Sequence, residues 1–220
     1  MAGAGTLGVR VRIAILGGTG SFGRALAARL VALGEDEVVI GSRDEARARA
    51  TAAELGPDVR GAENSDAVRG ATLAVLAVKA EAALATAEEI AGALGRTPLF
   101  SVASDFQFSR AGCRPDPDPR SLAERIQDMV EGPVTAGLHS IAAANLDEAP
   151  PEEDALVCGD DAEAKELALA LAAKLVAGRA LDAGPLASAR TLEGLTAVIV
   201  NLNRRYRAHA GITVTGVDHS

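Results

Sequence analysis

A glycine-rich turn between an apolar strand and a helix constrains this chain more than any other feature. Residues 12–23 read Arg-Ile-Ala-Ile-Leu-Gly-Gly-Thr-Gly-Ser-Phe-Gly, and Gly18, Gly20 and Gly23 have the G-x-G-x-x-G spacing. In such a motif one glycine allows the tight turn, one lets the backbone approach a pyrophosphate, and one lets helix and strand pack closely. Free N–H groups at the start of the following helix favour phosphate. The turn therefore predicts a βαβ unit that binds a dinucleotide.

The residues that follow the turn continue this pattern. Phe22, Leu26, Leu30 and Leu33 repeat at helical spacing, as expected for a helix that covers a sheet. Strand and helix patterns then alternate, with continuous apolar runs that are typical of buried parallel strands. This alternation predicts an α/β fold with a Rossmann-type doubly wound parallel sheet. The expected strands are 11–16, 37–40, 58–63, 73–78 and 98–102, and the expected helices between them include 44–55 and 80–94.

The end of the second expected strand indicates which dinucleotide binds. NAD sites usually place an acid there to hold the ribose 2′-OH, whereas this chain reads Ile-Gly-Ser-Arg-Asp over residues 40–44. Arg43 can pair with a 2′-phosphate, Ser42 can donate another hydrogen bond, and Arg47 lies one turn further on. Alternatively, Ser42 caps the helix through the box Ser42-x-x-Glu45, and both arginines lie on a solvated helix face. The charge pattern favours NADP.

The second half of the chain has a less regular pattern. We expect a long loop over residues 104–120, then a helix that starts at the capping box Ser121-x-x-Glu124. Residues 1–150 are predicted to form an NADP-binding Rossmann domain, and residues 151–220 a small C-terminal helical portion over the carboxyl edge of the sheet. The remaining expected elements are strands 133–138, 155–158 and 179–182, and helices 161–176, 187–193 and 195–209.

Charge and cysteine content exclude several classes of function. A net charge of −8 argues against binding to nucleic acid or to an anionic membrane, and no apolar run approaches the ~20 residues that span a bilayer. Cys113 and Cys158 are far apart and lack the spacing of metal ligands. We therefore expect no metal site, no nucleic-acid or membrane partner, and a reduced, cytoplasmic protein.

Five segments together suggest a family. They are Ile-Leu-Gly-Gly-Thr-Gly at 15–20, Ile-Gly-Ser-Arg at 40–43, Val-Cys-Gly-Asp-Asp at 157–161, Leu-Asp-Ala-Gly-Pro-Leu at 181–186, and Asn-Arg-Arg-Tyr-Arg-Ala-His-Ala-Gly at 203–211. With these segments the chain resembles the NADPH-dependent reductases of coenzyme F420, a deazaflavin. The resemblance runs from about residue 10 to the end of the chain. The first two segments are common among NADP proteins, and the last three are more specific to this family.

The resemblance implies hydride transfer between NADPH and F420 by a protein that is usually a homodimer. It implies that the residues around the glycine turn touch the NADP pyrophosphate, and that Ser42, Arg43 and Arg47 hold the 2′-phosphate. Val78 and Lys79 would lie beside the ribose and nicotinamide, and Ser104 is a further expected cofactor-binding residue. Residues near His139, Ala143 and Ala210 would line the deazaflavin site. The expected pyrophosphate-binding residues are Gly18, Thr19, Gly20, Ser21 and Phe22.

The chain departs from the family pattern in two places beside the expected reaction centre. Many members have Pro and a bulky aromatic residue where this chain has Lys79 and Ala80, and many have Pro within the segment that here reads Ser-Val-Ala-Ser-Asp over 101–105. Lys79 either meets an anionic substrate group or reaches solvent. These departures leave open an NADPH-dependent reductase of another acceptor, such as a flavin, an imine or a keto compound. A non-catalytic NADPH-binding sensor is the other alternative.

The expected chemistry depends on the two coenzymes, which the protein positions. His139 is the candidate catalytic residue, because it can donate a hydrogen bond to the reduced deazaflavin and histidine titrates near neutral pH. Its alternative role is that of a structural histidine. Arg204, Arg205 and Arg207 either hold the phosphate or glutamate tail of the deazaflavin or complement the dipole at the end of their helix.

Overall fold

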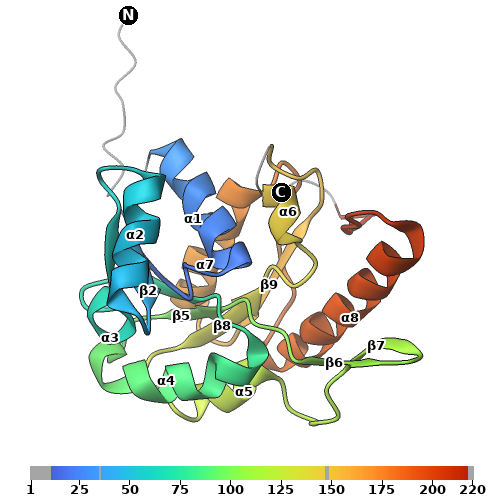
Figure 1. The fold of residues 1–220 in the computed structure, drawn as a ribbon. Coiled ribbons are helices and arrows are strands. Elements are labelled where there is room, and N and C mark those ends of the chain that lie inside the picture. Colours follow the sequence, from blue (N-terminus) through green and yellow to red (C-terminus); the bar gives the residue numbers. More distant parts are fainter. Residues whose placement is uncertain (1–10, 35, 147–148, 218–220) are drawn as a thin grey trace, which may run out of the picture.

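An eight-stranded sheet with helices on both faces forms the body of the molecule (Figure 1). The computed structural model describes residues 11–34, 36–146 and 149–217. The strand order is β10-β9-β8-β5-β4-β1-β2-β3, and β9 runs antiparallel to β8 while the other neighbouring pairs are parallel. The strands are β1 Arg12–Leu16, β2 Glu37–Ser42, β3 Arg60–Glu63, β4 Leu73–Leu76, β5 Leu99–Ser101, β8 Val134–Gly137, β9 Ala155–Gly159 and β10 Ala180–Asp182. This sheet confirms the predicted Rossmann-type fold class.

Two apolar layers lie on opposite faces of the sheet. In β1, Ile13 and Ile15 point into one layer, whereas Ala14 and Leu16 point into the other. A strand buried on both faces must be apolar throughout, which explains the unbroken run in this segment. Helices α1, α2 and α7 cover the first face, and α3, α4, α5 and α8 contribute to the second. The helices are α1 Ser21–Leu33, α2 Glu45–Leu55, α3 Asn64–Ala67, α4 Ala80–Leu94, α5 Leu122–Gln127, α6 Ala143–Leu146, α7 Ala162–Leu175 and α8 Ala189–Tyr206.

The position of β1 creates a crevice at the carboxyl edge of the sheet. The chain moves from β1 to β2 and β3 on one side, then returns to place β4 and β5 on the other. Loops after β1 and β4 therefore diverge, and this switch point is where open α/β sheets bind ligands. The glycine turn leaves β1 at this point and leads into α1.

The segment 104–120 contains a β-hairpin, so the prediction of a loop without secondary structure was wrong. Strands β6 Phe106–Ser109 and β7 Gly112–Pro115 pair antiparallel and stand apart from the main sheet (Figure 1). The Asn201 side chain on α8 holds β7 by accepting from the Cys113 N–H at 2.8 Å and donating to the Cys113 carbonyl at 2.7 Å. A two-stranded hairpin is marginal alone, and this contact supplies support that a local sequence pattern does not show.

The C-terminal helix is continuous, so the prediction of two helices over 187–193 and 195–209 was also wrong. A short 3-10 turn, Leu186–Ser188, leads directly into α8, which includes Gly194 without a break. Glycine costs about 1 kcal/mol in a helix interior and suggested an interruption. Here it lies against the hairpin, where an added Cβ would be 3.5 Å from Pro115. The close packing offsets the weak helix propensity.

Residues beyond 150 continue the same sheet through β9 and β10 and cover it with α7. The chain after α8 returns to β9, where the Asp154 N–H donates to the Ile212 carbonyl at 2.8 Å and the Val214 N–H donates to the Asp154 carboxylate at 2.8 Å. The division of the chain at residue 150 stays a prediction. Among the described residues, no helix combines the length and apolar character needed to cross a membrane.

Candidate active site

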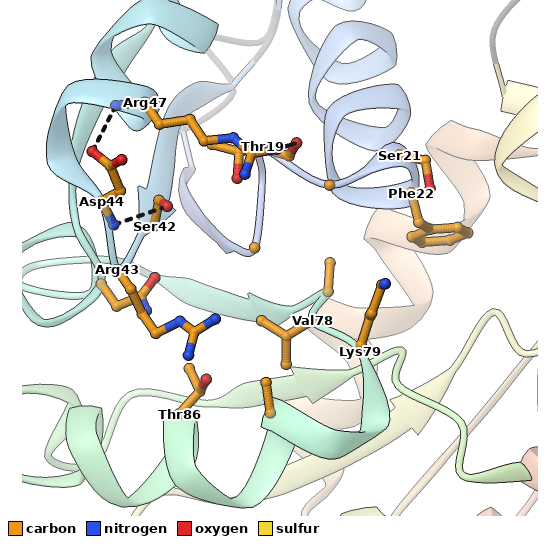
Figure 2. A pocket seen from close by; sticks show the side chains of 15 residues that line it. Thr19, Ser21, Phe22, Ser42, Arg43, Asp44, Arg47, Val78, Lys79 and Thr86 are labelled. Atoms are coloured by element: carbon orange, nitrogen blue, oxygen red, sulfur yellow. Dashed lines mark hydrogen bonds between the residues drawn. The ribbon is translucent and has the colours of Figure 1, made fainter.

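A cavity of about 590 Å³ lies at the carboxyl ends of β1, β2 and β4 (Figure 2). This volume lies within the range of small-molecule and cofactor sites. The cavity brings together nine of the predicted cofactor-binding residues, from three separate segments of the chain. They are Thr19, Gly20, Ser21, Phe22, Ser42, Arg43, Arg47, Val78 and Lys79; further lining residues include Asn64, Ala82 and Thr86.

The glycine turn is packed so tightly that side chains larger than hydrogen do not fit. A Cβ added to Gly23 would lie 2.6 Å from the Gly17 carbonyl oxygen, and one on Gly18 would lie 2.9 Å from the Ile15 carbonyl oxygen. Gly17 has φ +76°, a left-handed conformation that favours glycine. Gly18 therefore shapes the turn from behind and does not line the cavity. No side chain caps α1 at Gly20, so the first N–H groups of the helix face the cavity.

The end of β2 places one unpaired cation beside the turn. Among the described residues, Arg43 forms no hydrogen bond or salt bridge, and its exposed guanidinium points toward Thr86 in Figure 2. Arg47 reaches across to the glycine turn, where its Nη2 lies 3.4 Å from the Thr19 carbonyl oxygen. The two guanidinium groups thus approach the cavity from different walls, as a 2′-phosphate clamp requires.

The predicted capping box at Ser42 was wrong in its details. The helix cap is Asp44, whose carboxylate accepts from the Arg47 N–H at 3.1 Å, and α2 begins at Glu45. The Ser42 Oγ instead accepts from the Asp44 N–H at 3.2 Å. An aspartate at the N-cap satisfies the helix N–H groups as well as serine does. The Ser42 hydroxyl proton therefore stays available to a ligand in the cavity.

A second cavity, of about 500 Å³, adjoins the first and shares Phe22, Val78 and Lys79 with it. Its walls come from the start of α4, the end of β5, the hairpin, the loop after β8 and the middle of α8. Its other lining residues are Ala80, Glu81, Val102, Ala103, Ser104, Asp105, Phe106, Phe108, Leu138, His139, Ile141 and Thr196. The mixture of aromatic and apolar walls with a few polar groups suits a planar organic ligand.

Two hydroxyl groups join the walls of the second cavity. Thr196 on α8 donates to the His139 carbonyl at 2.8 Å, and Ser104 lies 2.8 Å from the same Thr196 oxygen. Since Thr196 donates its proton to His139, Ser104 donates to Thr196. These bonds connect the end of β5, the end of β8 and α8, which are far apart in sequence. They hold the backbone that presents His139.

His139 is buried against the second cavity without a partner for its ring. The residue is 7% exposed, and neither ring nitrogen has a hydrogen-bond partner among the described residues. Burial lowers the pKa of His139 to about 4, and the smaller, opposing effect comes from the Ala103 backbone. The expectation that His139 titrates near neutral pH was therefore wrong, because desolvation disfavours the charged ring. A neutral imidazole still has one N–H to donate and one nitrogen to accept.

Backbone strain supports a functional position for this segment. Leu138, directly before His139, has φ +63°, which costs a non-glycine residue about 1–2 kcal/mol. The strained residue lines the second cavity itself. Such outliers persist where the surrounding structure fixes them, and they gather at binding and catalytic sites.

Residues 12–105 match the family described as NADP oxidoreductase, coenzyme F420-dependent. The chain is 30% identical, over 94% of its own length and the full length of the relative, to the F420-dependent NADP reductase of Methanocaldococcus jannaschii. This chain belongs to the F420-dependent NADP reductase family. It is also 34% identical to the F420-dependent NADP reductase of Methanothermobacter marburgensis, with 94% of this chain and 99% of that protein covered.

A solved structure of a bacterial protein agrees with this membership. The crystal structure provisionally described as an F420-dependent NADP reductase from Arthrobacter sp. FB24 superposes with a TM-score of 0.81 at 29% identity, and covers 93% of this chain and 99% of that one. The family predicted from the five sequence segments is thus confirmed.

The second cavity is lined by both a basic and two acidic side chains. The side chain of Lys79, at the N-cap of α4, forms no hydrogen bond or salt bridge with any described residue, and Figure 2 shows its amino group beside Phe22. Glu81 and Asp105 contribute carboxylates to the same cavity. Burial, with the negative charge of Asp116, raises the pKa of Asp105. Lys79 is the one lysine or arginine among the described residues that line this cavity.

Besides Gly18, two expected site residues line neither cavity. Ala143 begins the short helix α6, and the Ala210 N–H donates to the Asn203 Oδ1 at 2.6 Å beyond the end of α8. Neither belongs to the residues that line the cavities in the described part of the chain. Sequence reasoning did not single out Phe106, Phe108 or Thr196 as site residues. The alternation Phe-Gln-Phe at 106–108 was a usable signal for a strand, whereas Thr196 carries no local signal.

Proposed function

We propose that this protein transfers a hydride between NADPH and the deazaflavin coenzyme F420. The observation that carries the proposal is the pair of adjoining cavities with a common wall of Phe22, Val78 and Lys79. Two coenzymes that exchange a hydride must meet at one boundary with their reacting atoms about 3–3.5 Å apart. The family relatives carry the same activity in their names.

The first cavity fits NADP(H) in the chemistry of its groups. The uncapped start of α1 supplies N–H groups and a positive dipole end for the pyrophosphate. Arg43 and Arg47, with the hydroxyl of Ser42, supply charge-assisted and neutral hydrogen bonds for the 2′-phosphate. Val78 lies in the wall shared with the second cavity, and in this assignment it packs against the nicotinamide.

The second cavity fits the acceptor ring. Phe106 and Phe108 present aromatic surface, with their ring centres 5.5 Å apart in an edge-to-face arrangement. His139 offers a neutral N–H to a ring oxygen or nitrogen, which would satisfy one of its two orphaned ring atoms. NADPH and F420 supply the hydride chemistry when bound. The protein contributes orientation, exclusion of water, and a hydrogen bond from His139. The roles of Ala143 and Ala210 at this site rest on the family resemblance alone.

Mixing the protein anaerobically with NADPH and oxidised F420 tests the proposal. Loss of the visible absorbance of the deazaflavin, much slower with NADH than with NADPH, is the expected result. The matched control omits protein. If the spectrum stays unchanged while titration shows that NADPH binds, F420 is refuted as the acceptor, and the assignment of the first cavity to NADPH is retained.

Lys79 favours a second candidate, an NADPH-dependent reductase of an acceptor that carries a negative charge. Its amine is unpaired in the described structure and faces both cavities, where many family members have Pro. The same anaerobic assay with a flavin, an imine and a keto acid separates this candidate from the first. A non-catalytic sensor would show no turnover with any of them.

We further propose a cytoplasmic homodimer. Val198, Leu202 and Tyr206 are exposed at four-residue spacing on α8, with 52%, 38% and 68% of their surface accessible, and form one apolar stripe. An apolar stripe on a helix favours burial against a second copy. Both cysteines are free and buried, as suits a reducing compartment. Light scattering of the protein and of Leu202→Asp tests the assembly: loss of the dimer in the variant is expected, and a monomeric parent protein would refute it.

A further inference from the structure

Arg204, at the mouth of the second cavity, forms a cation–π contact with an aromatic ring and has no salt bridge to a carboxylate in the described structure. The Arg204 guanidinium carbon lies 5.7 Å from the centre of the Phe108 ring. Phe108 lines the second cavity yet is 63% exposed, so the ring marks the cavity mouth. Stacking on a ring occupies the face of a guanidinium and leaves its edge of N–H donors free. Arg204 therefore presents donors at the entrance of the acceptor site.

Arg204 has no acidic partner among the described residues, and Arg43 and Arg205 share this property. The molecule carries a net charge of −8, so carboxylates are abundant. Arg24, Arg49 and Arg120 each approach a carboxylate within 2.7 Å. Among the described residues, the Arg204 side chain forms no salt bridge and no hydrogen bond. No carboxylate in the described part of the chain therefore pairs with this guanidinium at the cavity mouth.

The contact between Arg204 and Phe108 is fixed by the fold. Asn201 clamps β7 through the Cys113 backbone, and Arg204 follows Asn201 by three residues, which places both on one face of α8. Arg190 on the same helix donates to the Asp116 carbonyl at 2.6 Å, beyond the other end of the hairpin strand. Figure 1 shows α8 and the hairpin side by side along this contact. The next residue, Arg205, lies about 100° further around the helix. Its side chain forms no hydrogen bond, ion pair or ring contact with the hairpin in the described structure.

We propose that Arg204 binds the anionic side chain of the acceptor, at a phosphate or a carboxylate that leaves the second cavity past Phe108. This inference rests on the proposed function, because it assumes that the deazaflavin ring occupies that cavity. A guanidinium matches both groups with paired N–H donors. Phe108 positions the guanidinium, and Arg204 contributes affinity for the tail without touching the reacting ring.

The test compares three ligands that differ only in their tails. Dissociation constants are measured by deazaflavin fluorescence for the ring without a tail, for the coenzyme with its phosphate but without glutamates, and for complete F420. The proteins are the parent chain, Arg204→Ala, Arg204→Lys and the neighbouring control Arg205→Ala. We expect Arg204→Ala to weaken complete F420 about tenfold, the scale of one charge-assisted bond at an exposed site. The tailless ring should change less than twofold.

The outcomes separate the alternatives. A loss already seen with the phosphate-bearing form assigns Arg204 to the phosphate, and a loss confined to complete F420 assigns it to the glutamates. Arg204→Lys should retain part of the affinity, and Arg205→Ala all of it. Equal losses for the ring and for complete F420, or no loss for either, would overturn the tail assignment. If the parent protein binds none of the three ligands, the proposed function fails and the inference fails with it. NADPH affinity, unchanged in every variant, shows that the variants are folded.

Discussion

Removing the Arg43 side chain should convert an NADPH-selective site into one with little preference. Arg43 is exposed at the end of β2, lines the first cavity, and makes no other interaction in the described structure. Arg43→Ala therefore removes no hydrogen bond or ion pair that stabilises the described structure. Ser42 and Arg47 remain, but Arg47 is partly engaged with the Thr19 carbonyl at 3.4 Å. The variant should thus lose about one charge-assisted interaction with the 2′-phosphate.

The magnitude follows from that count. One hydrogen bond to a charged group contributes about 1.5–3 kcal/mol, which corresponds to an NADPH dissociation constant raised ~10- to 150-fold. NADH lacks the phosphate, so its affinity should change less than twofold. Because Arg43 is exposed, added salt should screen its charge and reduce the difference in NADPH affinity between the parent protein and the variant.

Titration of NADPH and NADH fluorescence at two salt concentrations measures both constants. Arg49→Ala is the matched control, since Arg49 pairs with Glu45 at 2.7 Å and does not line the cavity. The reasoning would be refuted by equal losses for NADPH and NADH. It would also be refuted by an NADPH loss of the same size in the Arg49 control.

Three further substitutions test the structure elsewhere. Gly23→Ala should destabilise the protein by at least about 2 kcal/mol and abolish NADPH binding, because its Cβ would lie 2.6 Å from a backbone oxygen; an unchanged melting temperature would contradict this packing. Glu193 is buried and accepts from the Leu122 and Ala123 N–H groups, and burial raises its pKa to about 7 from 4.5. Because this pKa is raised in the folded state, Glu193 makes its full contribution to the free energy of unfolding below pH 4.5. It loses about 3 kcal/mol of that contribution as the pH rises through 7. Urea unfolding at pH 5 and pH 8 should show this loss in the parent protein but not in Glu193→Gln. The Arg179 hydrogen bond holds the pKa of the buried Asp154 well below its usual range, so this carboxylate stabilises the fold above pH 4 and loses that effect as pH falls. Asp154→Ala should cost about 3–5 kcal/mol at pH 7, because it removes the carboxylate that pairs with Arg179 and accepts from the Val214 N–H. A loss below about 1 kcal/mol by denaturant unfolding would argue against this ion pair.

The local pattern predicted the first cavity well, because its parts lie where strands of a parallel sheet end. The turn at 17–23 and the residues at 42–47 follow β1 and β2 directly, and parallel strands bring their carboxyl ends to one edge. Helix caps were harder to assign. Ser42 and Asp44 both satisfy the local rule, and only the backbone geometry selected Asp44 as the cap.

The second cavity depended on contacts between distant segments. Thr196 reaches His139 across 57 positions and Ser104 across 92, so no window of sequence contains the site. The hairpin at 106–115 owes its support to Asn201, which is why a loop was the local expectation. The pKa of His139 depends on burial, and burial is a property of the packed molecule.

The sequence by itself determined the sheet class, the dinucleotide turn and the cationic end of β2, since strand periodicity, glycine spacing and side-chain charge are all local properties. The tertiary structure alone decided that α8 and the hairpin close a second cavity beside the first, that His139 is neutral within it, and that Arg204 stands at its mouth. These features arise from the burial and the long-range packing of side chains that are remote in the chain, and no short-range pattern encodes such proximity.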